Sequence, residues 1–585
     1  MAYSSLHKMN STGDIMPEGN SNDLGEGLIR LSGGRALARA LRPEGIDAVF
    51  GIAGGKIAPF LQAVEEEGLR YIGVRHEAAG VMMAAAHYAA TGRMALAFAE
   101  LGPGSANAVG GLASALNNRL PLLLITSNNS HGAAYPAKGG LMEIDSAAML
   151  RPLTKWSAVV HDPKRLPELV RAAFRAALTG RPGPVHLELP QDVLEAQTVF
   201  PTGAFARAPA TYRLTTLPSP HPDAVQAALA LLRGAKRPLL IAGGGLARSG
   251  EYQPLRALAK RLSAAVTTTQ SGIGMVASDD PDFFGHGGAI GGPAVLRALR
   301  EADVVLALGM RVSSWFWRKG EWLGAPGQAI IQVESDPEAL GQNTPLSLGI
   351  LADAAATVRA LAQACPGPGI ADPAWVAGLA AEWRGYQAQL GADASGPVMH
   401  PAVLARALGA ALPPDALVVY DGGHTSFWSN DLTPVLEPRT RFHEAGMAQL
   451  GFGLPYALSL AALHPGRPVV NITGDGSFGF TLQELDTARR YGLNVVNIVH
   501  NNASWGVIAA GQTRKGFRLG VDLEGTDYAA IARGFGGFGE TVTTPEALAP
   551  ALARAFAAQA PAVLDCRVSF MPHPMLRAMG EMFDV

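Results

Sequence analysis

Two short motifs near the C-terminal end contain side chains that could bind a metal ion. The first is Gly474-Asp475-Gly476-Ser477 and the second is Asn501-Asn502, with 24 residues between Gly476 and Asn501. That interval has room for a helix, predicted at Leu482–Arg490, and a buried strand, predicted at Val495–Val499. One βαβ unit would bring Asp475 and Asn502 to the same edge of a parallel sheet, where ligands bind in such folds.

The chemistry of these residues points to a metal-bound phosphate group. A carboxylate and an amide oxygen suit a hard cation such as Mg²⁺, whose other ligands would be diphosphate oxygens and water. Gly474 and Gly476 let backbone N–H groups approach the phosphates. A simple tight turn is the alternative for the first motif, and the second motif at this spacing favours the metal site.

A second set of candidate residues lies in the N-terminal third. Glu77 follows the predicted strand Tyr71–Val74 and opens a predicted helix, Ala78–Thr91. An acidic residue in the first turn stabilises a helix by itself, so a purely structural role is equally open at this point. Two loops flank it in the sequence: Phe50-Gly-Ile-Ala-Gly-Gly55 upstream and Glu100-Leu-Gly-Pro-Gly-Ser-Ala-Asn107 downstream.

Composition limits the class of protein. The 585 residues are 48% hydrophobic and 16% charged, which suits a large α/β protein of three or four domains. The net charge of −2 leaves no basic surface for nucleic acid or an anionic membrane, and no apolar run demands a membrane span. Two distant cysteines, Cys365 and Cys566, form no disulfide framework, so the expected location is the cytoplasm. The polar first residues do not resemble a signal peptide.

The elements that must position these residues fall into three α/β blocks. We predict a disordered tail at 1–26, domains at 27–200, 223–365 and 395–570, and a C-terminal tail at 571–585. Strands alternating with helices predict three doubly wound, mostly parallel sheets. The predicted strands are Ala48–Gly51, Tyr71–Val74, Ala95–Ala99, Pro121–Ile125, Val185–Leu189, Pro238–Ala242, Ala265–Thr268, Val304–Leu308, Ala329–Val333, Ala416–Tyr420, Val469–Thr473, Val495–Val499 and Ala562–Val568.

Taken together, these motifs resemble those of thiamine diphosphate enzymes, namely the acetolactate synthase, 2-oxo acid decarboxylase and oxalyl-CoA decarboxylase superfamily. The resemblance covers roughly residues 28–570 in the order pyrimidine-binding domain, central domain and diphosphate-binding domain. It is specific because independent motifs agree in order and in spacing. It implies thiamine diphosphate and Mg²⁺ as cofactors.

The resemblance assigns the pyrimidine half of the cofactor site. Glu77 would hydrogen-bond N1′ of the aminopyrimidine and so favour the imino form that removes the thiazolium proton. Asn107 and the Ala53-Gly54 turn match other pyrimidine contacts. Leu450 would be the apolar wedge between the two cofactor rings, and the Ala448 carbonyl would accept a hydrogen bond from N4′.

It also assigns the diphosphate half. Asp475, Asn502 and the backbone carbonyl of Ser504 would bind Mg²⁺. The other implied diphosphate-binding residues are His424, Thr425, Gly474, Gly476 and Ser477. For His424 the alternative is a surface-loop histidine.

The substrate pocket is predicted from the neighbouring residues. Glu100 would be a catalytic acid or base near the reacting carbon, and a structural ion pair is the alternative. Trp505, Val507 and Ile508 would shape the pocket wall. Pyruvate decarboxylases of the yeast type carry a glutamate at the Ile508 position, which argues against that type.

The central block contains weaker signals for a nucleotide. Gly243-Gly-Gly245 could be a phosphate turn and Glu334-Ser-Asp336 could reach a ribose. FAD or ADP is therefore possible there. Trp315 and Met142 stand where acetolactate synthases have an arginine and a glutamine, which argues against that activity and against FAD. The stretch around Arg318-Lys319 is nearer to that of CoA-thioester lyases.

The sequence predicts an enzyme that makes or breaks a C–C bond beside a carbonyl. A 2-oxo acid would lose CO₂, and a proton or a second carbonyl would trap the product. The alternatives are a CoA-thioester lyase acting on an acyl-CoA and a non-catalytic regulatory subunit. A nucleotide-dependent dehydrogenase is disfavoured because no GxGxxG motif opens a helix. The resemblance also implies a homodimer or homotetramer with active sites at the subunit interface.

Overall fold

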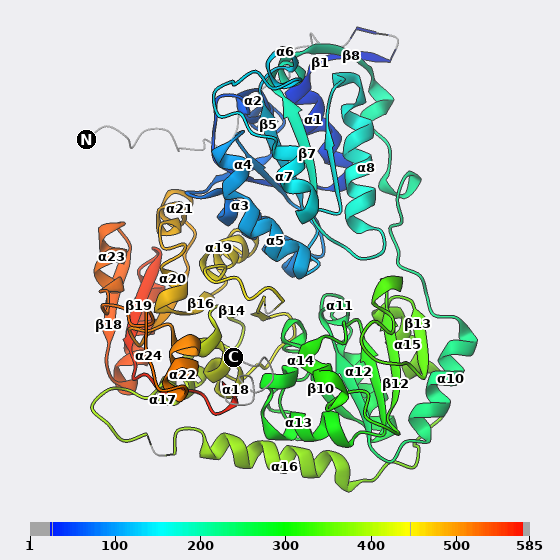
Figure 1. The fold of residues 1–585 in the computed structure, drawn as a ribbon, viewed down its shortest axis with the longest axis vertical. Coiled ribbons are helices and arrows are strands. Elements are labelled where there is room, and N and C mark those ends of the chain that lie inside the picture. Colours follow the sequence, from blue (N-terminus) through cyan, green and yellow to red (C-terminus); the bar gives the residue numbers. More distant parts are fainter. Residues whose placement is uncertain (1–23, 26, 393, 445, 577–585) are drawn as a thin grey trace, which may run out of the picture.

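The computed structural model describes residues 24, 25, 27–392, 394–444 and 446–576. Three α/β domains follow one another along the chain, each built on its own parallel sheet, which confirms the predicted fold class. In Figure 1 the first domain (blue to cyan) lies above the central domain (green) and the third domain (yellow to red). The domain limits given above stay predictions, and the predicted tail at 1–26 lies almost entirely outside the described residues.

The first domain has a six-stranded parallel sheet of order β3-β2-β4-β5-β7-β6. Its strands are β2 (Ala48–Gly51), β3 (Arg70–Gly73), β4 (Leu96–Ala99), β5 (Leu123–Asn128), β6 (Trp156–Val159) and β7 (Val185–Pro190). Its helices are α1 (Gly33–Leu41), α2 (Ala58–Glu66), α3 (Glu77–Thr91), α4 (Pro103–Asn107), α5 (Val109–Asn117), α6 (His131–Ala134), α7 (Ser146–Leu150), α8 (Leu166–Leu178) and α9 (Gln191–Glu195). A separate antiparallel ribbon joins β1 (Leu28–Ser32) to β8 (Gln197–Pro201).

The central domain has a five-stranded parallel sheet of order β10-β9-β11-β12-β13. Its strands are β9 (Pro238–Ala242), β10 (Ala265–Thr268), β11 (Val304–Leu308), β12 (Ala329–Glu334) and β13 (Leu348–Leu351). Its helices are α10 (Pro222–Arg233), α11 (Gly244–Ala247), α12 (Tyr252–Leu262), α13 (Gly292–Glu301), α14 (Ser314–Trp317) and α15 (Ala354–Ala364). The long helix α16 (Ala374–Gln389) follows and packs on α13, along the lower edge of Figure 1.

The third domain has a six-stranded parallel sheet of order β15-β14-β16-β17-β19-β18. Its strands are β14 (Leu417–Tyr420), β15 (Arg441–Phe442), β16 (Val469–Gly474), β17 (Val496–Asn501), β18 (Phe538–Val542) and β19 (Ala562–Arg567). Its helices are α17 (Pro401–Ala411), α18 (Gly423–Leu432), α19 (Gly453–Leu463), α20 (Asp475–Phe478), α21 (Glu484–Tyr491), α22 (Gly506–Arg514), α23 (Tyr528–Gly534) and α24 (Pro545–Ala557).

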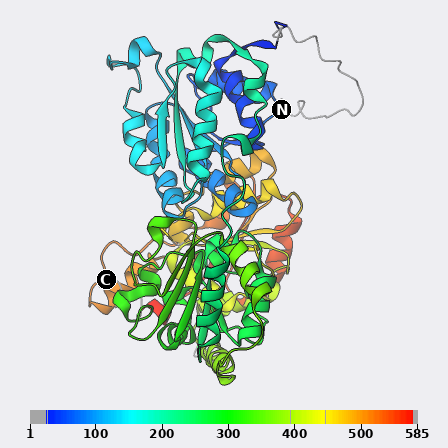
Figure 2. The same cartoon turned by 90° about the vertical axis from the view of Figure 1, so that its right-hand side faces the viewer.

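The first and third domains share one hydrophobic core. Helices α3 and α19 are apolar on nearly all sides, so each must be buried on all sides. They pack on each other, and the Ser459 hydroxyl donates to the Met83 carbonyl at 2.9 Å across the contact. Both views show the first domain seated on the lower two, and Figure 2 shows the central domain in front of the third. The loops predicted to bind the pyrimidine and the diphosphate are therefore attached to one shared hydrophobic core.

The strands that sequence patterns did not predict lie at sheet edges or are very short. They are β1, β6, β8, β13, β15 and β18, of which β15 has two residues. Edge strands are half-exposed, so their apolar alternation is weak. The stretch 103–117 forms two helices, α4 and α5, which meet at Ala108. Among the residues that the structure describes, no helix is long and apolar enough to cross a membrane.

Candidate active site

Glu77 is the first residue of α3 and is 7% exposed. Its carboxylate accepts a hydrogen bond from the Asn107 amide at 2.9 Å. A side chain at Gly104 would come within 3.1 Å of the other Glu77 oxygen, so α4 lies directly against the carboxylate. The structure thus brings Glu77 and Asn107 together, although 30 residues separate them in the sequence.

Glu100 follows β4 and holds the Ala53-Gly54 turn. One carboxylate oxygen accepts from the backbone N–H groups of Lys56 and Ile57, at 3.1 and 3.2 Å. The other accepts from the Ser127 hydroxyl at 2.8 Å. A Cβ on Gly54 would lie 2.0 Å from this carboxylate, so only glycine fits there. Among the described residues Glu100 has no ion-pair partner, so the ion pair considered as its structural alternative is not observed.

Asp475 and Asn502 lie at the ends of neighbouring strands. β16 and β17 are parallel, and Gly474 is aligned with His500. One Asp475 oxygen accepts from the Gly476 N–H at 2.8 Å, and the other is buried without a hydrogen-bond partner. The Asn502 amide oxygen accepts from the Ser504 N–H at 3.0 Å. The βαβ unit thus places a carboxylate and an amide on the same sheet edge.

The residues present fit a magnesium–diphosphate group. A buried carboxylate oxygen without a partner is costly, and burial raises the pKa of Asp475 to about 6. A cation beside it would remove that cost. The glycines form a close cradle, because a Cβ on Gly476 would lie 2.5 Å from the Trp505 ring and one on Gly474 would lie 3.1 Å from the Thr425 hydroxyl.

A metal ion at this site would have few charged protein ligands. In the described part of the chain, no group of three or more His, Cys, Asp or Glu side chains could hold a metal ion. An ion at Asp475 would depend on one carboxylate, the Asn502 amide, a backbone carbonyl and the oxygens of its ligand, as Mg²⁺ with a phosphate compound does.

His424 is buried in α18 and does not lie on an exposed loop. Its Nε2 lies 2.7 Å from the Met571 carbonyl, which can only accept, so Nε2 carries the proton. Burial lowers the pKa of His424 to about 4, so the ring is neutral near pH 7. Its Nδ1, 3.5 Å from the Asn502 amide nitrogen, is then an acceptor. The structure thus places His424 beside Asn502, and its contact with the diphosphate stays a prediction.

The loop with the predicted wedge is anchored by Asp421. The carboxylate of Asp421 accepts from Gly451 N–H at 3.3 Å and from Gly453 N–H at 3.1 Å. Within this loop Ala448 has a left-handed backbone, with φ of 54°, and Leu450 is half-buried. The sequence-based assignment gave Asp421 no role. The sequence feature that could have indicated a role is its position directly after a buried strand. Burial raises the pKa of Asp421 to about 6.

The predicted pocket residues take different positions. Trp505 lies over Gly476, and Val507 lies against Gly423, where a Cβ would come within 2.8 Å of it. Ser477 lies beside Gly422, where a Cβ would come within 2.8 Å of its hydroxyl. Ile508 is 51% exposed. Trp505 and Val507 thus contact the glycine loops, whereas Ile508 lies at the surface of a single chain.

The two halves of the candidate site lie on different domains of the chain. Glu77 and Asn107 belong to the first domain, and Asp475 and Asn502 belong to the third. Among the described residues, no hydrogen bond or ion pair joins one pair to the other. A ligand that contacts both halves must therefore bridge them.

Comparison with known proteins identifies the family. Residues 31–149 match the thiamine pyrophosphate enzyme N-terminal TPP-binding domain, residues 225–361 its central domain, and residues 421–566 its C-terminal TPP-binding domain. The chain belongs to the thiamine pyrophosphate enzymes of the acetolactate synthase-like superfamily.

Relatives within this family match over most of their length. An acetolactate synthase large subunit from Parasynechococcus marenigrum is 34% identical over 92% of this chain and 88% of its own. A probable 2-ketoarginine decarboxylase from Pseudomonas aeruginosa is 34% identical over 86% of this chain and 88% of its own. An acetolactate synthase isozyme 2 large subunit from Escherichia coli is 28% identical over 89% of this chain and 93% of its own.

This thiamine pyrophosphate enzyme also has a cavity of about 810 Å³ between its first and central domains. Gly244, Gly245, Arg248 and Arg311 are among its lining residues. In the described part of the chain, the guanidinium groups of Arg248 and Arg311 have no ion-pair partner, although Arg248 lies over the Tyr88 ring. The cavity thus offers two cations beside a glycine loop.

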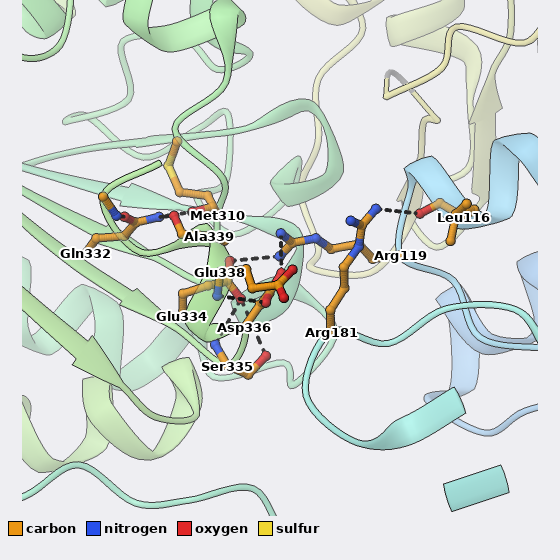
Figure 3. A network of polar contacts seen from close by, with 11 residues as sticks. Leu116, Arg119, Arg181, Met310, Gln332, Glu334, Ser335, Asp336, Glu338 and Ala339 are labelled. Atoms are coloured by element: carbon orange, nitrogen blue, oxygen red, sulfur yellow. Dashed lines mark hydrogen bonds and ion pairs between the residues drawn. The ribbon is translucent and has the colours of Figure 1, made fainter. Parts of the chain in front are cut away.

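The acidic residues predicted to reach a ribose already have partners. Arg119, which follows α5, donates to Glu334 at 3.0 Å and to Asp336 at 3.2 Å (Figure 3). The remaining oxygens accept from the Ser335 and Glu338 N–H groups. A nucleotide in this cavity would bind beside the ion-paired residues and would not replace Arg119. The fit is therefore to phosphates near Arg248 and Arg311, and FAD or ADP there stays a prediction.

Proposed function

We propose that this thiamine pyrophosphate enzyme needs Mg²⁺ and acts on a 2-oxo acid, by decarboxylation followed by protonation or carboligation. The supporting observation is the buried Asp475 oxygen that lacks a partner, beside Asn502 on the next strand. The Glu77–Asn107 pair supplies the second half of the site. With both halves intact, a catalytic protein is favoured over a non-catalytic regulatory subunit.

Each predicted site residue has its own role in this proposal. When bound, the cofactor would supply the nucleophile and the electron sink that decarboxylation of a 2-oxo acid requires. Asp475, Asn502 and the Ser504 carbonyl hold Mg²⁺, which anchors the diphosphate. Glu77 holds a proton at the pyrimidine ring, and Asn107 orients its carboxylate. The residues assigned to cofactor contacts are Ala53, Gly54, His424, Thr425, Ala448, Leu450, Gly474, Gly476 and Ser477.

We infer that two copies of the chain build each active site. The two halves lie on different domains, and among the described residues no hydrogen bond or ion pair joins Glu77 or Asn107 to Asp475 or Asn502. Large apolar side chains are exposed in loops at the carboxyl ends of the two sheets, among them Leu141 and Leu519, which are 81% and 78% exposed. A second copy would cover them, as a homodimer or a homotetramer.

The relatives and the pocket support the proposed substrate class. Relatives act, by their names, in acetolactate synthesis or 2-ketoarginine decarboxylation. Trp315 lines the cavity between the first and central domains, and Met142 lies against Gly102. Neither can make the polar contacts of an arginine or a glutamine. A CoA thioester is the second candidate, because Arg248 and Arg311 could meet the phosphates of CoA.

The proposal is tested by CO₂ release from a panel of 2-oxo acids, pyruvate and 2-ketoarginine included, with thiamine diphosphate and Mg²⁺ added. Release is expected from at least one member. Identification of the product as an aldehyde or an acyloin then separates decarboxylation from carboligation. Absence of release, with turnover of an acyl-CoA, would favour the second candidate.

Glu100→Ala separates a positioning role from direct proton transfer. Three donors now meet this carboxylate, so its loss should loosen the turn at Ala53-Gly54. The expected result is weaker cofactor binding, by about tenfold for each hydrogen bond lost, with kcat little changed at saturating cofactor. A fall in kcat with unchanged cofactor affinity would show that Glu100 takes part in catalysis directly.

We expect the purified protein to be colourless. Glu334 and Asp336 are held by Arg119, and Trp315 stands where acetolactate synthases have an arginine. The visible absorption spectrum of the protein, and of the supernatant after denaturation, checks this. A flavin spectrum at one equivalent per chain would contradict it.

A further inference from the structure

Helix α21 of the third domain forms hydrogen bonds with the turn that precedes Glu77. Glu484 is the first residue of α21 and is fully buried. Both of its carboxylate oxygens lie 3.1 Å from the Arg75 backbone N–H, two residues before Glu77. The Thr487 hydroxyl, one turn along α21, donates to the Glu484 carboxylate at 2.6 Å and keeps it in place. A buried glutamate thus accepts a hydrogen bond from a backbone amide that lies 409 residues away in the sequence.

The same helix holds the end of β3. The Gly73 N–H donates to the Tyr491 hydroxyl at 2.8 Å. The Gly73 carbonyl accepts from the Arg490 guanidinium at 2.6 Å. Glycine is required at this point, because a Cβ would lie 2.6 Å from the Tyr71 hydroxyl and 3.1 Å from that of Tyr491. Two points of the turn, Gly73 and Arg75, are therefore held by the third domain.

Glu77 depends on this turn for its direction. Its side chain hydrogen-bonds only to Asn107 among the described residues. Glu77 is the first residue of α3, so the backbone of residues 73–76 sets the direction of its side chain. Displacement of a reacting group by about 1 Å can reduce a rate by about 10²-fold.

We propose that Glu484 is a positioning residue for Glu77. The proposal rests on the function proposed above, in which Glu77 meets the pyrimidine ring. Helix α21 follows closely after α20, which begins with Asp475. One stretch of chain, 475–491, therefore carries the metal ligand of one half-site and the clamp on the other. If a cofactor bridges two copies, this stretch connects two different cofactor sites through one protein chain.

The experiment compares Glu484→Ala with Glu77→Gln and the unaltered enzyme. At saturating thiamine diphosphate and Mg²⁺, exchange of the C2 proton of the cofactor with D₂O should slow by about 10²-fold in Glu484→Ala. The cofactor dissociation constant should stay unchanged. In the cofactor-free protein, backbone deuterium uptake over residues 70–83 should rise. Glu484→Gln keeps one acceptor for Arg75, so its exchange should be slowed by only about tenfold, less than in Glu484→Ala.

A matched control is Glu444→Ala. Glu444 is a buried glutamate at the same domain contact, where it accepts from Ser114 and Asn118 at 3.0 Å, away from the β3–α3 turn. It should lower the melting temperature and leave proton exchange and uptake at 70–83 unchanged.

The possible failures are distinguishable. Normal C2 exchange in Glu77→Gln would overturn the proposed function, and deuterium uptake in the cofactor-free protein would still test the clamp. Slow exchange in Glu77→Gln with normal exchange in Glu484→Ala would overturn the positioning role alone. If Glu484→Ala does not fold, Glu484→Gln carries the test: it should slow exchange by about tenfold, the equivalent of one weakened hydrogen bond, and exchange and uptake equal to those of the unaltered enzyme would overturn the role.

Discussion

Glu77→Gln is expected to lower turnover by about 10²–10⁴-fold while the protein still folds and binds its cofactor. Glutamine has the same shape and keeps an oxygen for the Asn107 amide, which now donates to Glu77 at 2.9 Å. What it lacks is a carboxylate that can share a proton with the pyrimidine ring. Steady-state kinetics and calorimetric titration with thiamine diphosphate and Mg²⁺ give the two quantities separately.

Glu188→Gln is a matched control for this variant. Glu188 is another buried glutamate of the first domain, and it accepts from the Tyr135 hydroxyl and the Asn128 amide. Its substitution should change stability and leave turnover at saturating cofactor close to that of the unaltered enzyme. Full turnover in Glu77→Gln would contradict the assigned role, whatever the control does.

Asp475→Asn should abolish binding of Mg²⁺ and thiamine diphosphate and make the cofactor-free protein more stable. Burial raises the pKa of Asp475 from 3.8 to about 6, so the folded protein binds the proton more tightly than the unfolded chain. The free energy of unfolding therefore falls as pH rises through this window, and the ionised group costs about 3 kcal/mol at neutral pH. Asparagine removes the charge but buries an amide, which leaves a net gain of about 1–2 kcal/mol.

Thermal unfolding at neutral pH checks both parts of this prediction. Without cofactor, the variant should melt above the unaltered protein. With thiamine diphosphate and Mg²⁺, only the unaltered protein should gain stability, because a ligand stabilises the state that binds it. A variant that melts lower without cofactor, or that still gains stability with it, would contradict the role of Asp475 as a metal ligand.

Much of the fold was predictable because its signals are local. Buried parallel strands are continuous apolar runs, and the interior strands β9 and β11 begin and end where the sequence predicts. Edge strands such as β13 and β18 face solvent on one side, and short polar stretches carry no comparable pattern. Cross-domain contacts leave no local pattern at all, so neither the Glu484–Arg75 contact nor the Arg119 ion pairs were predicted.

The sequence by itself determined the βαβ unit that brings Asp475 beside Asn502, because turn glycines, helix period and an apolar strand all act over short stretches of chain. The tertiary structure decided what each polar side chain does with its hydrogen bonds. In the folded protein, Glu100 hydrogen-bonds to the turn that contains Gly54, His424 to the Met571 carbonyl, and Glu484 to the turn before Glu77. The physical reason is that a buried polar atom must find a partner, and that partner is chosen by packing between distant segments.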